Sequence, residues 1–407
     1  MMRSSRYYIL ALVMLLFGML LLGCEDKDEG DSQEPARDQA AQLTPTLPFP
    51  VELTMWHGLS GAALDGLQQA MARFQEDHPD ISVVLEYRVP SALRSDFEEA
   101  VPAGGGPDVL VAEIGWIADL ADAGYLVPLS SDVTQQVDSN ALASLYPALW
   151  YRDRVWGVPL SGDVLVMYTN QTMLGAPPRT VEELRAVAEN QPVVLYPGAE
   201  GTLGLYPGTS SSVIDLDGRV IFSQLPLMDY FSTYQLLDVH QGIRFSADAG
   251  AFSRGEVALQ VGYASWYPQI SEALGEDVSV HLLPPIQSVE WRPFMWVTPV
   301  VISQNAPDIS IQAAELLLSY LLSAQGQRFI TEQTGQAPLT VADADSLSPF
   351  QLVVWNQFLR ARPVSPYPVF AEVLLPTIDD ALESASEADV ALDDLASTII
   401  ETLRAAD

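Results

Sequence analysis

Cysteine and lysine are almost absent from this chain of 407 residues. Cys24 is the only cysteine, so the protein can form neither an internal disulfide nor a cysteine-based metal site. Lys27 is the only lysine, which excludes a lysine nucleophile or base from the rest of the chain. The four histidines, at positions 57, 78, 240 and 281, are not spaced like metal ligands. We therefore expect neither a metal nor a cofactor.

Positive charge is also scarce. Lysine and arginine together number 19, against 53 acidic residues, and the net charge is −34. Such a charge repels nucleic acid, so we expect no nucleic-acid partner. Apolar residues make up 48% of the chain and aromatic residues 9%, which is enough for a packed core. The length suits two domains or one two-lobed unit.

The longest apolar run lies near the N-terminus. Arg3 and Arg6 precede an apolar stretch over residues 9–22, which is short for a membrane-spanning helix and typical of a secretory signal. It ends in L-L-G-C at 21–24 and so resembles the bacterial lipoprotein signal, in which residues 1–23 are removed and Cys24 carries lipid. An uncleaved anchor helix is the alternative, and both place the body outside the cytoplasm, held at a membrane. Residues 24–50, rich in acidic residues and proline, predict a flexible tether.

Apolar spacing predicts an α/β fold for the rest of the chain. Residues 51–55 and 81–87 alternate as strands do, and apolar residues recur at helical spacing over 64–74 between them. This order indicates parallel sheets with right-handed crossovers. Further strands are predicted at 109–111, 164–168, 193–196, 257–261 and 297–303, and a hairpin at 151–160 with Asp153 and Arg154 at its tip. Helices are predicted at 116–123, 311–322, 326–332, 350–360, 378–385 and 390–404. A capping box at 180–183 predicts the start of another helix.

Six groups of segments occur in an order that resembles the family 1 extracellular solute-binding proteins, the maltose-binding-protein group. They extend from residue 56 to residue 327, so the resemblance covers most of the body. The segments are W-H-G-L-S-G at 56–61 with F-Q-E-D-H-P-D-I at 74–81, G-P-D-V at 106–109 with L-A-D-A-G-Y-L-V-P-L at 120–129, W-G-V-P at 156–159 with M-Y-T-N at 167–170, F-S-R-G-E-V-A-L at 252–259, L-L-P at 282–284, and L-L-S-A-Q-G-Q at 321–327.

The resemblance implies a two-lobed periplasmic binding protein type II fold, in which each lobe is a mostly parallel sheet flanked by helices and a hinge joins the lobes. Lobe 1 would comprise residues 51–160 and 285–335, and lobe 2 residues 161–284 and 336–407. The implied function is binding of a small solute, which we expect to be a mono- or oligosaccharide, in a cleft whose lobes close on it. The implied partners are the permease subunits of an ABC importer, and we expect a monomer.

The candidate binding residues are rings and carboxylates near the expected cleft, because flat apolar faces stack on sugar rings and carboxylates accept hydrogen bonds from hydroxyls. Asp163 matches the family's cleft acid near the hinge. Trp266 matches its stacking tryptophan, with Tyr267 as the alternative one residue later. Each could instead have a structural role, as a hinge acid or a core aromatic residue.

Some further candidates lie at or after the ends of predicted strands, because ligands bind at the carboxyl ends of strands in open α/β sheets. Trp296 lies near the return to the hinge, and Tyr367 and Phe370 lie in a proline-rich turn before the last helices, where they would add an aromatic contact. A structural histidine or a core aromatic residue is the alternative reading for these too. The candidates are Trp56, His57, Ser60, Glu113, Trp116, Trp296, Tyr367 and Phe370.

An enzyme is the main rival class, because glycoside hydrolases also stack sugars and use paired carboxylates. The sequence contains no G-x-S-x-G, H-E-x-x-H, P-loop or dinucleotide motif, so we expect no catalytic residue. A structural or adhesion lipoprotein is a second alternative. A third is the same receptor fold for a polyamine, a glycerol phosphodiester or an oligopeptide. A phosphate ligand would need clustered arginines, whereas an acidic, aromatic cleft would also suit a cation.

Overall fold

The computed structural model describes residues 50–207, 213–215, 217–285, 290–342, 344–387 and 390–406. The predicted signal, Cys24 and the tether as far as residue 49 lie outside the described residues. Within the described part of the chain, no helix is both long and apolar enough to cross a membrane.

The fold opens with the parallel arrangement that the sequence predicts. Its elements are β1 (Val51–His57), α2 (Gly61–Asp77), β2 (Ile81–Tyr87), α3 (Pro90–Ala100) and β3 (Val109–Val111). β1 lies between β2 and β3 and is parallel to both. Leu53 and Met55 of β1 and Leu67 and Phe74 of α2 are fully buried in one core. The alternating and helical spacings in the sequence therefore mark the buried faces of these elements.

Eight short elements connect β3 to the next long strand. They are η1 (Ile114–Trp116), α4 (Ile117–Asp122), β4 (Leu126–Val127), α5 (Ser131–Asn140), η2 (Ala143–Leu145), α6 (Tyr146–Leu149), β5 (Trp150–Tyr151) and β6 (Arg154–Val155). The hairpin tip is Arg152 and Asp153, one residue earlier than predicted. Both have positive φ, 48° and 58°, the backbone of a type I′ turn, which matches the twist of paired strands.

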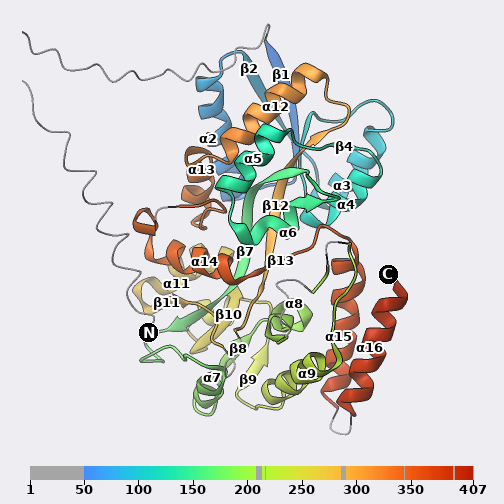
Figure 1. The fold of residues 1–407 in the computed structure, drawn as a ribbon. Helices are drawn as coiled ribbons and strands as arrows, with labels where there is room; N and C mark the ends of the chain where they lie inside the picture. Colours follow the sequence, from blue (N-terminus) through green and yellow to red (C-terminus); the bar gives the residue numbers. More distant parts are fainter. Residues whose placement is uncertain are drawn as a thin grey trace, which may run out of the picture. The chain divides into compact units, whose positions relative to one another are not determined.

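Two long antiparallel strands connect the two halves of the sheet (Figure 1). They are β7 (Gly157–Asn170) and β12 (Phe294–Ser303). β12 pairs with β3 of the first half, β7 pairs with β10 (Leu259–Tyr263) of the second half, and β7 and β12 pair with each other. Pro159 faces Pro299 where their register shifts, because neither proline has an N–H to donate to the ladder.

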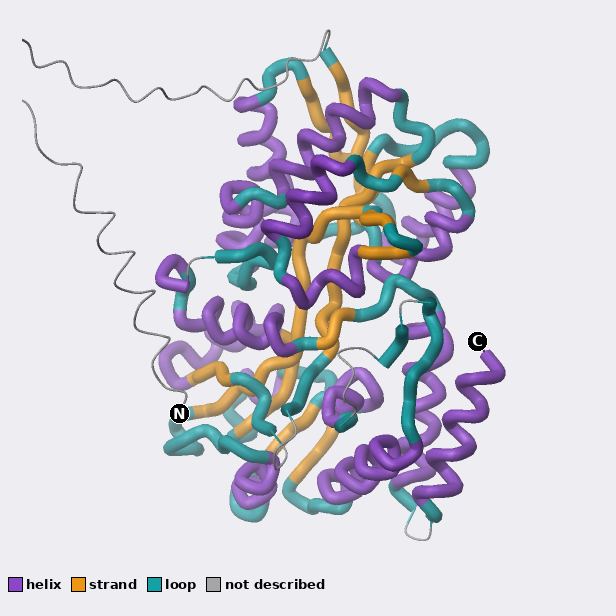
Figure 2. Tube along the Cα trace, viewed as in Figure 1, coloured by secondary structure: helices purple, strands orange, loops and turns teal. Residues whose placement is uncertain are grey.

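The second half repeats the parallel pattern. Its remaining elements before β12 are α7 (Val181–Ala188), β8 (Val193–Leu195), α8 (Gly198–Thr202), η3 (Leu203–Leu205), α9 (Gln224–Asp238), β9 (Ile243–Phe245), α10 (Gly250–Ser253), η4 (Ala264–Trp266), α11 (Tyr267–Leu274), η5 (Gly275–Asp277) and β11 (Val278–His281). β8 is parallel to both β10 and β9, and the sheet order is β2-β1-β3-β12-β7-β10-β8-β9. Figure 2 shows the strands continuing from one half to the other through β12 and β7.

Helices dominate the end of the chain. They are α12 (Asp308–Leu321), α13 (Ala324–Thr334), α14 (Pro349–Arg360), α15 (Leu375–Ala385) and α16 (Leu392–Ala406), with the shorter η6 (Ala344–Ser346), β13 (Arg362–Pro363) and the π-helical turn η7 (Phe370–Leu374) between them. α13 packs on α2, α15 on α8, and α16 on α9. The C-terminal helices α15 and α16 therefore cover elements of the second half.

The predicted capping box at the start of α7 is only half formed. The Thr180 hydroxyl accepts a hydrogen bond from the Glu183 N–H at 3.1 Å. The Glu183 carboxylate accepts its bond from the N–H of Arg179 rather than from that of Thr180. The helix still begins where predicted, because one capped N–H is enough to mark its start.

Candidate functional site

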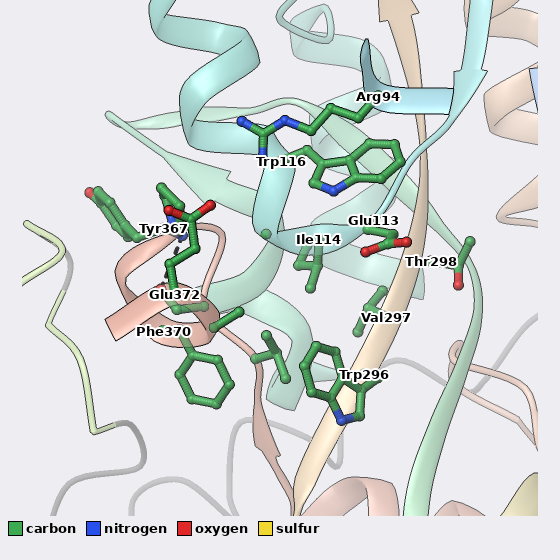
Figure 3. Close-up of a pocket in the computed structure, with 15 residues that line it drawn as sticks. Arg94, Glu113, Ile114, Trp116, Trp296, Val297, Thr298, Tyr367, Phe370 and Glu372 are labelled. Carbon is green, nitrogen blue, oxygen red and sulfur yellow. Dashed lines mark hydrogen bonds between the residues drawn. The ribbon is translucent and has the colours of Figure 1, made fainter. Parts of the chain in front are cut away.

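A cavity of about 280 Å³ lies beside the crossing strand β12 (Figure 3). Three stretches distant in sequence supply most of its wall: the turn after β3, the middle of β12, and the segment that leads into η7. The first of these follows the carboxyl end of a parallel strand, where open α/β sheets place ligands. The lining residues are Arg94, Glu113, Ile114, Gly115, Trp116, Trp296, Val297, Thr298, Val364, Ser365, Tyr367, Pro368, Phe370, Ala371 and Glu372.

Aromatic side chains form much of the cavity wall. Trp116 and Trp296 are partly exposed, whereas Phe370 is 1% exposed and supports the wall from behind. The Phe370 ring packs edge-on against Trp296, with 6.3 Å between ring centroids. The indole N–H of Trp296 is shielded from solvent and has no partner among the described residues. A ligand acceptor could satisfy this N–H, and the rings could stack on a flat apolar face.

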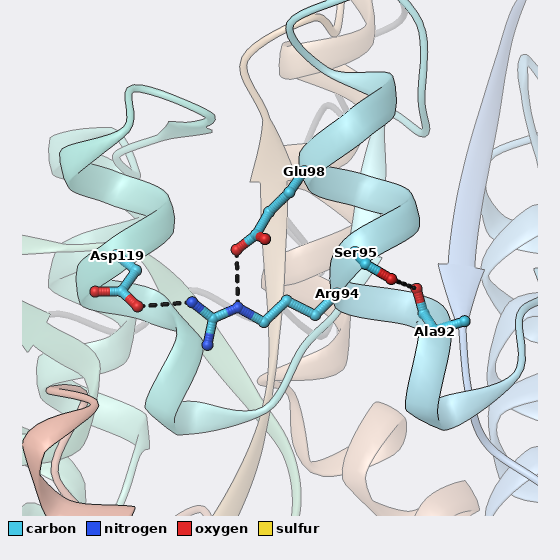
Figure 4. Close-up of polar contacts among 5 residues, drawn as sticks. All are labelled: Ala92, Arg94, Ser95, Glu98 and Asp119. Atoms are coloured by element: carbon cyan, nitrogen blue, oxygen red, sulfur yellow. Dashed lines mark hydrogen bonds and ion pairs between the residues drawn. The ribbon is translucent and has the colours of Figure 1, made fainter. Parts of the chain in front are cut away.

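One arginine and two glutamates provide the charge of the cavity. Arg94 donates to Glu98 at 2.8 Å and to Asp119 at 2.6 Å, so its charge is already paired (Figure 4). Glu113 and Glu372 form no salt bridge within the described part of the chain. Partial burial raises the pKa of Glu113, and the positive charge of Arg94 opposes this shift. The cavity therefore presents acceptors to a ligand and no unpaired cation.

Asp163 lies next to this cavity through the sheet, because it pairs with Trp296 in the β7–β12 register. Its Oδ1 accepts hydrogen bonds from the N–H groups of Val164 at 2.9 Å and Ser265 at 3.1 Å. Burial raises the pKa of Asp163 to about 6, although the bonds from Ser265 and Val164 favour the charged form. Asp163 thus holds the end of β10 in place and keeps a carboxyl group close to Trp296.

A second group of rings lies near Asp163, whose charge acts on Tyr196 and Tyr263. The Trp266 ring lies 6.0 Å from that of Tyr196 and 6.4 Å from that of Tyr263. Trp266 folds back over β10, and a Cβ at Gly262 would lie 2.2 Å from its ring, so only glycine fits there. The Tyr263 hydroxyl hydrogen-bonds to Glu200. These residues form a polar and aromatic surface on the second half of the sheet.

A second cavity, of about 500 Å³, adjoins this surface. Its wall combines tyrosines with carboxylates, and none of the described residues that form it is an arginine. Asp379 accepts a hydrogen bond from the N–H of Ala199 at 2.6 Å, which ties α15 to the start of α8. The lining residues are Tyr196, Pro197, Gly198, Glu200, Tyr234, Asp379, Leu382, Glu383 and Ser386.

The first cavity brings together five of the predicted binding residues. These are Glu113, Trp116, Trp296, Tyr367 and Phe370. Asp163 is joined to them through Trp296, and Trp266 is joined to Asp163 through the loop at Ser265. The binding roles of all these residues stay predictions.

The other predicted residues do not line either cavity. Trp56 is buried and donates to Glu86 at 3.0 Å, and the Arg88 guanidinium lies 4.1 Å from its ring centroid. His57 is buried, and its Nδ1 accepts a hydrogen bond from the N–H of Leu59. Burial lowers the pKa of His57, so its neutral form is favoured.

Ser60 and Tyr267 also lie outside both cavity walls. Ser60 is exposed at the start of α2 and makes no side-chain capping bond. One face of the Tyr267 ring stacks on Phe350, with 3.8 Å between ring centroids. Of the two alternative stacking candidates, Trp266 is therefore the one that lies with other rings near Asp163.

Sequence reasoning missed several residues at this site: Arg94, Glu372, Tyr196, Glu200 and Tyr263. Tyr196 follows the carboxyl end of β8, so the strand-end rule that selected Trp116 could also have selected it. Arg94 and Glu372 lie within helical turns, and no local pattern indicates that they share one cavity. Among the described residues, no group of His, Cys, Asp and Glu could hold a metal ion.

The profile of a known family matches residues 69–349, which is more than half of the chain. Its description is "Bacterial extracellular solute-binding protein". The chain belongs to this family. The membership confirms the predicted extracytoplasmic binding protein and the prediction that it is not an enzyme.

Individual relatives of this solute-binding protein are distant in sequence and close in fold. The maltotriose-binding protein of Pyrococcus abyssi (strain GE5 / Orsay) is 26% identical over 138 residues, which is 34% of this chain and 30% of that protein. The maltodextrin-binding protein MalE1 from L. casei BL23, solved without ligand, has a TM-score of 0.76 at 16% identity, covering 87% of this chain and 99% of that chain. A cyclo/maltodextrin-binding protein complexed with maltotetraose has a TM-score of 0.75 at 18% identity, covering 89% and 98%. These matches confirm the predicted two-lobed fold.

Proposed function

We propose that this solute-binding protein captures a saccharide beside β12 and delivers it to the permease of an ABC importer. The observation that carries the proposal is the cavity of about 280 Å³, whose wall contains Trp116 and Trp296 together with the carboxylates of Glu113 and Glu372. Indole faces suit the apolar faces of pyranose rings, and carboxylates accept bidentate hydrogen bonds from neighbouring hydroxyls. Relatives whose names specify maltotriose and maltodextrin support a saccharide as the solute.

The ligand would lie between two lobes that close on it. We place lobe 1 at residues 51–160 and 285–335 and lobe 2 at residues 161–284 and 336–407. β7 and β12 are the crossing strands between them, and a few residues of such strands can absorb the backbone change of a hinge. Closure would bring the surface around Asp163 and Trp266 over a ligand held by Glu113 and Trp116, and the permease would recognise the closed form.

Thermal unfolding of residues 51–407 in the presence of a solute panel tests the saccharide proposal. A ligand that binds only the native state stabilises it by about 2.7 kcal/mol when its concentration is about 100 times the dissociation constant. We expect this gain with at least one saccharide and none with amino acids. A panel of saccharides that leaves the melting temperature unchanged would contradict the proposal.

We also propose that lipid on Cys24 anchors the protein to the membrane. The support is the apolar run that ends in Gly23-Cys24 and the absence of any other thiol in the chain. Labelled fatty acid should appear in the wild-type protein in cells and not in Cys24→Ala. Equal labelling of the two proteins would rule out lipid at this cysteine.

A further inference from the structure

Both sides of the candidate site carry carboxylates that form no salt bridge among the described residues. Glu113 and Glu372 line the first cavity, and its only arginine among the described residues, Arg94, is held by Glu98 and Asp119. Figure 3 shows the Glu113 carboxylate between the indoles of Trp116 and Trp296 in that view. The described lining therefore supplies more negative than positive charge, and its one arginine is shared with two further carboxylates.

Carboxylates also outnumber cationic side chains at the part of the site that lies on the second half of the sheet. Asp163 receives its hydrogen bonds from neutral groups, among them the N–H groups of Val164 and Ser265, and Glu200 receives its bond from the Tyr263 hydroxyl. Asp379 and Glu383 line the second cavity, where Asp379 is bonded to the N–H of Ala199. No arginine in the described part of the chain lines this cavity, and the chain's one lysine is Lys27, far away in the sequence.

Closing the lobes over a ligand would make this imbalance costly. Removing water from a carboxylate is unfavourable unless a counter-charge or several hydrogen bonds replace it. Hydroxyls of a neutral sugar supply hydrogen bonds only, whereas an ammonium group supplies hydrogen bonds and opposite charge. Partial burial raises the pKa of Glu113 although the charge of Arg94 opposes the shift, which is the direction expected for a carboxylate whose charge is not fully compensated. The indole faces beside it favour a cation as well.

We infer that the preferred solute is a cationic saccharide, one that carries an unacetylated amino group, with its ammonium placed between Glu113 and Glu372. The inference rests on the proposed saccharide function and narrows it to a chemical class. Arg94 would not repel such a ligand strongly, because Glu98 and Asp119 compensate its charge.

The test compares matched cationic and neutral saccharides by titration calorimetry on the full-length chain, kept in a detergent that contains no sugar. One pair is 6-amino-6-deoxymaltotriose and its N-acetyl derivative, and the other is the glucosamine trimer and its fully N-acetylated form. We expect the amino member of a pair to bind about tenfold tighter or more, because charge-assisted hydrogen bonds are stronger than neutral ones. The gain should shrink as salt is added.

Variants that remove one carboxylate charge test which residues produce the preference for the amino saccharide. Glu113→Gln and Glu372→Gln should each remove much of the preference for the amine while the neutral member still binds. Glu52→Gln, at the exposed start of β1, removes the same charge away from the cavity and should leave the preference unchanged. Equal affinities within both pairs, or a preference that survives in both cavity variants, would overturn the inference and leave saccharide binding standing. Failure of every saccharide to bind would overturn the proposed function and this inference together.

Discussion

At the residue scale, the ionisation of Asp163 is coupled to folding. Burial raises the pKa of its carboxyl group from 3.8 to about 6, so the folded protein retains a proton that the unfolded chain loses at lower pH. The free energy of unfolding should therefore fall by at most about 3 kcal/mol as pH rises between these two values. Above them it should stay constant. This component lowers the free energy of unfolding near neutral pH.

Asp163→Asn removes the titrating proton and keeps the shape of the side chain. The variant should gain stability relative to wild type as pH rises from about 4 to about 7, because only the wild type loses the contribution described above. Urea unfolding curves at several pH values in this range measure the difference. A difference between the two proteins that does not change with pH would contradict the coupling.

Two tryptophans at strand ends should respond differently to truncation. Trp116 is partly exposed in the cavity wall, so Trp116→Ala should weaken ligand binding at least about tenfold with little loss of stability. Trp56 is buried and bonded to Glu86, so Trp56→Ala should lower the free energy of unfolding by about 3–5 kcal/mol. Calorimetric titration and urea unfolding of both variants separate the effects, and a reversed pattern would place the site at Trp56.

At the element scale, two helices begin at serines with different bonding. Ser348 caps α14 through a full capping box with Gln351, whereas Ser130 precedes α5 without a side-chain capping bond. Ser348→Ala should therefore lower the free energy of unfolding by about 1 kcal/mol, and Ser130→Ala should lower it much less. Equal losses in urea unfolding would show that the capping bond of Ser348 contributes nothing.

The hairpin β5–β6 shows how a local pattern can misplace an element by one residue. The sequence indicates a hairpin here, but its tip depends on which residues adopt the left-handed backbone. Arg152 occupies the first such position, where its guanidinium lies over the Tyr151 ring and pairs with Asp122 at 2.8 Å. Asp122 belongs to α4, so the residue at this turn position makes a contact that is distant in sequence and that the local pattern does not encode.

At the scale of the whole molecule, the net charge of −34 governs the response to salt. Like charges repel in the compact state, and added ions screen them, because the Debye length falls from about 10 Å at 0.1 M to about 3 Å at 1 M salt. The melting temperature should therefore rise with sodium chloride and level off near this upper concentration. A melting temperature that is independent of salt would contradict net repulsion.

The sequence by itself determined most of the elements and the class of fold. Alternation over β1 and β2 and helical spacing over α2 reflect burial on one face, which is a local property of each element. It also determined what the chain cannot use, since one cysteine and one lysine leave few options for metal or covalent chemistry. The strand-end rule selected Glu113 and Trp116, both of which line the cavity.

Only the tertiary structure decided which candidates share a site. Glu113, Trp296 and Glu372 come from three distant segments, and their meeting depends on how β12 crosses the sheet and where η7 packs against it. Trp56 lies at the end of β1 and Trp116 follows β3, so both satisfy the strand-end rule. Trp56 is nevertheless buried against Glu86 and Arg88, whereas Trp116 lies in the cavity wall. Periodicity records whether a side chain is buried, whereas the identity of its neighbours depends on long-range packing that no local spacing encodes.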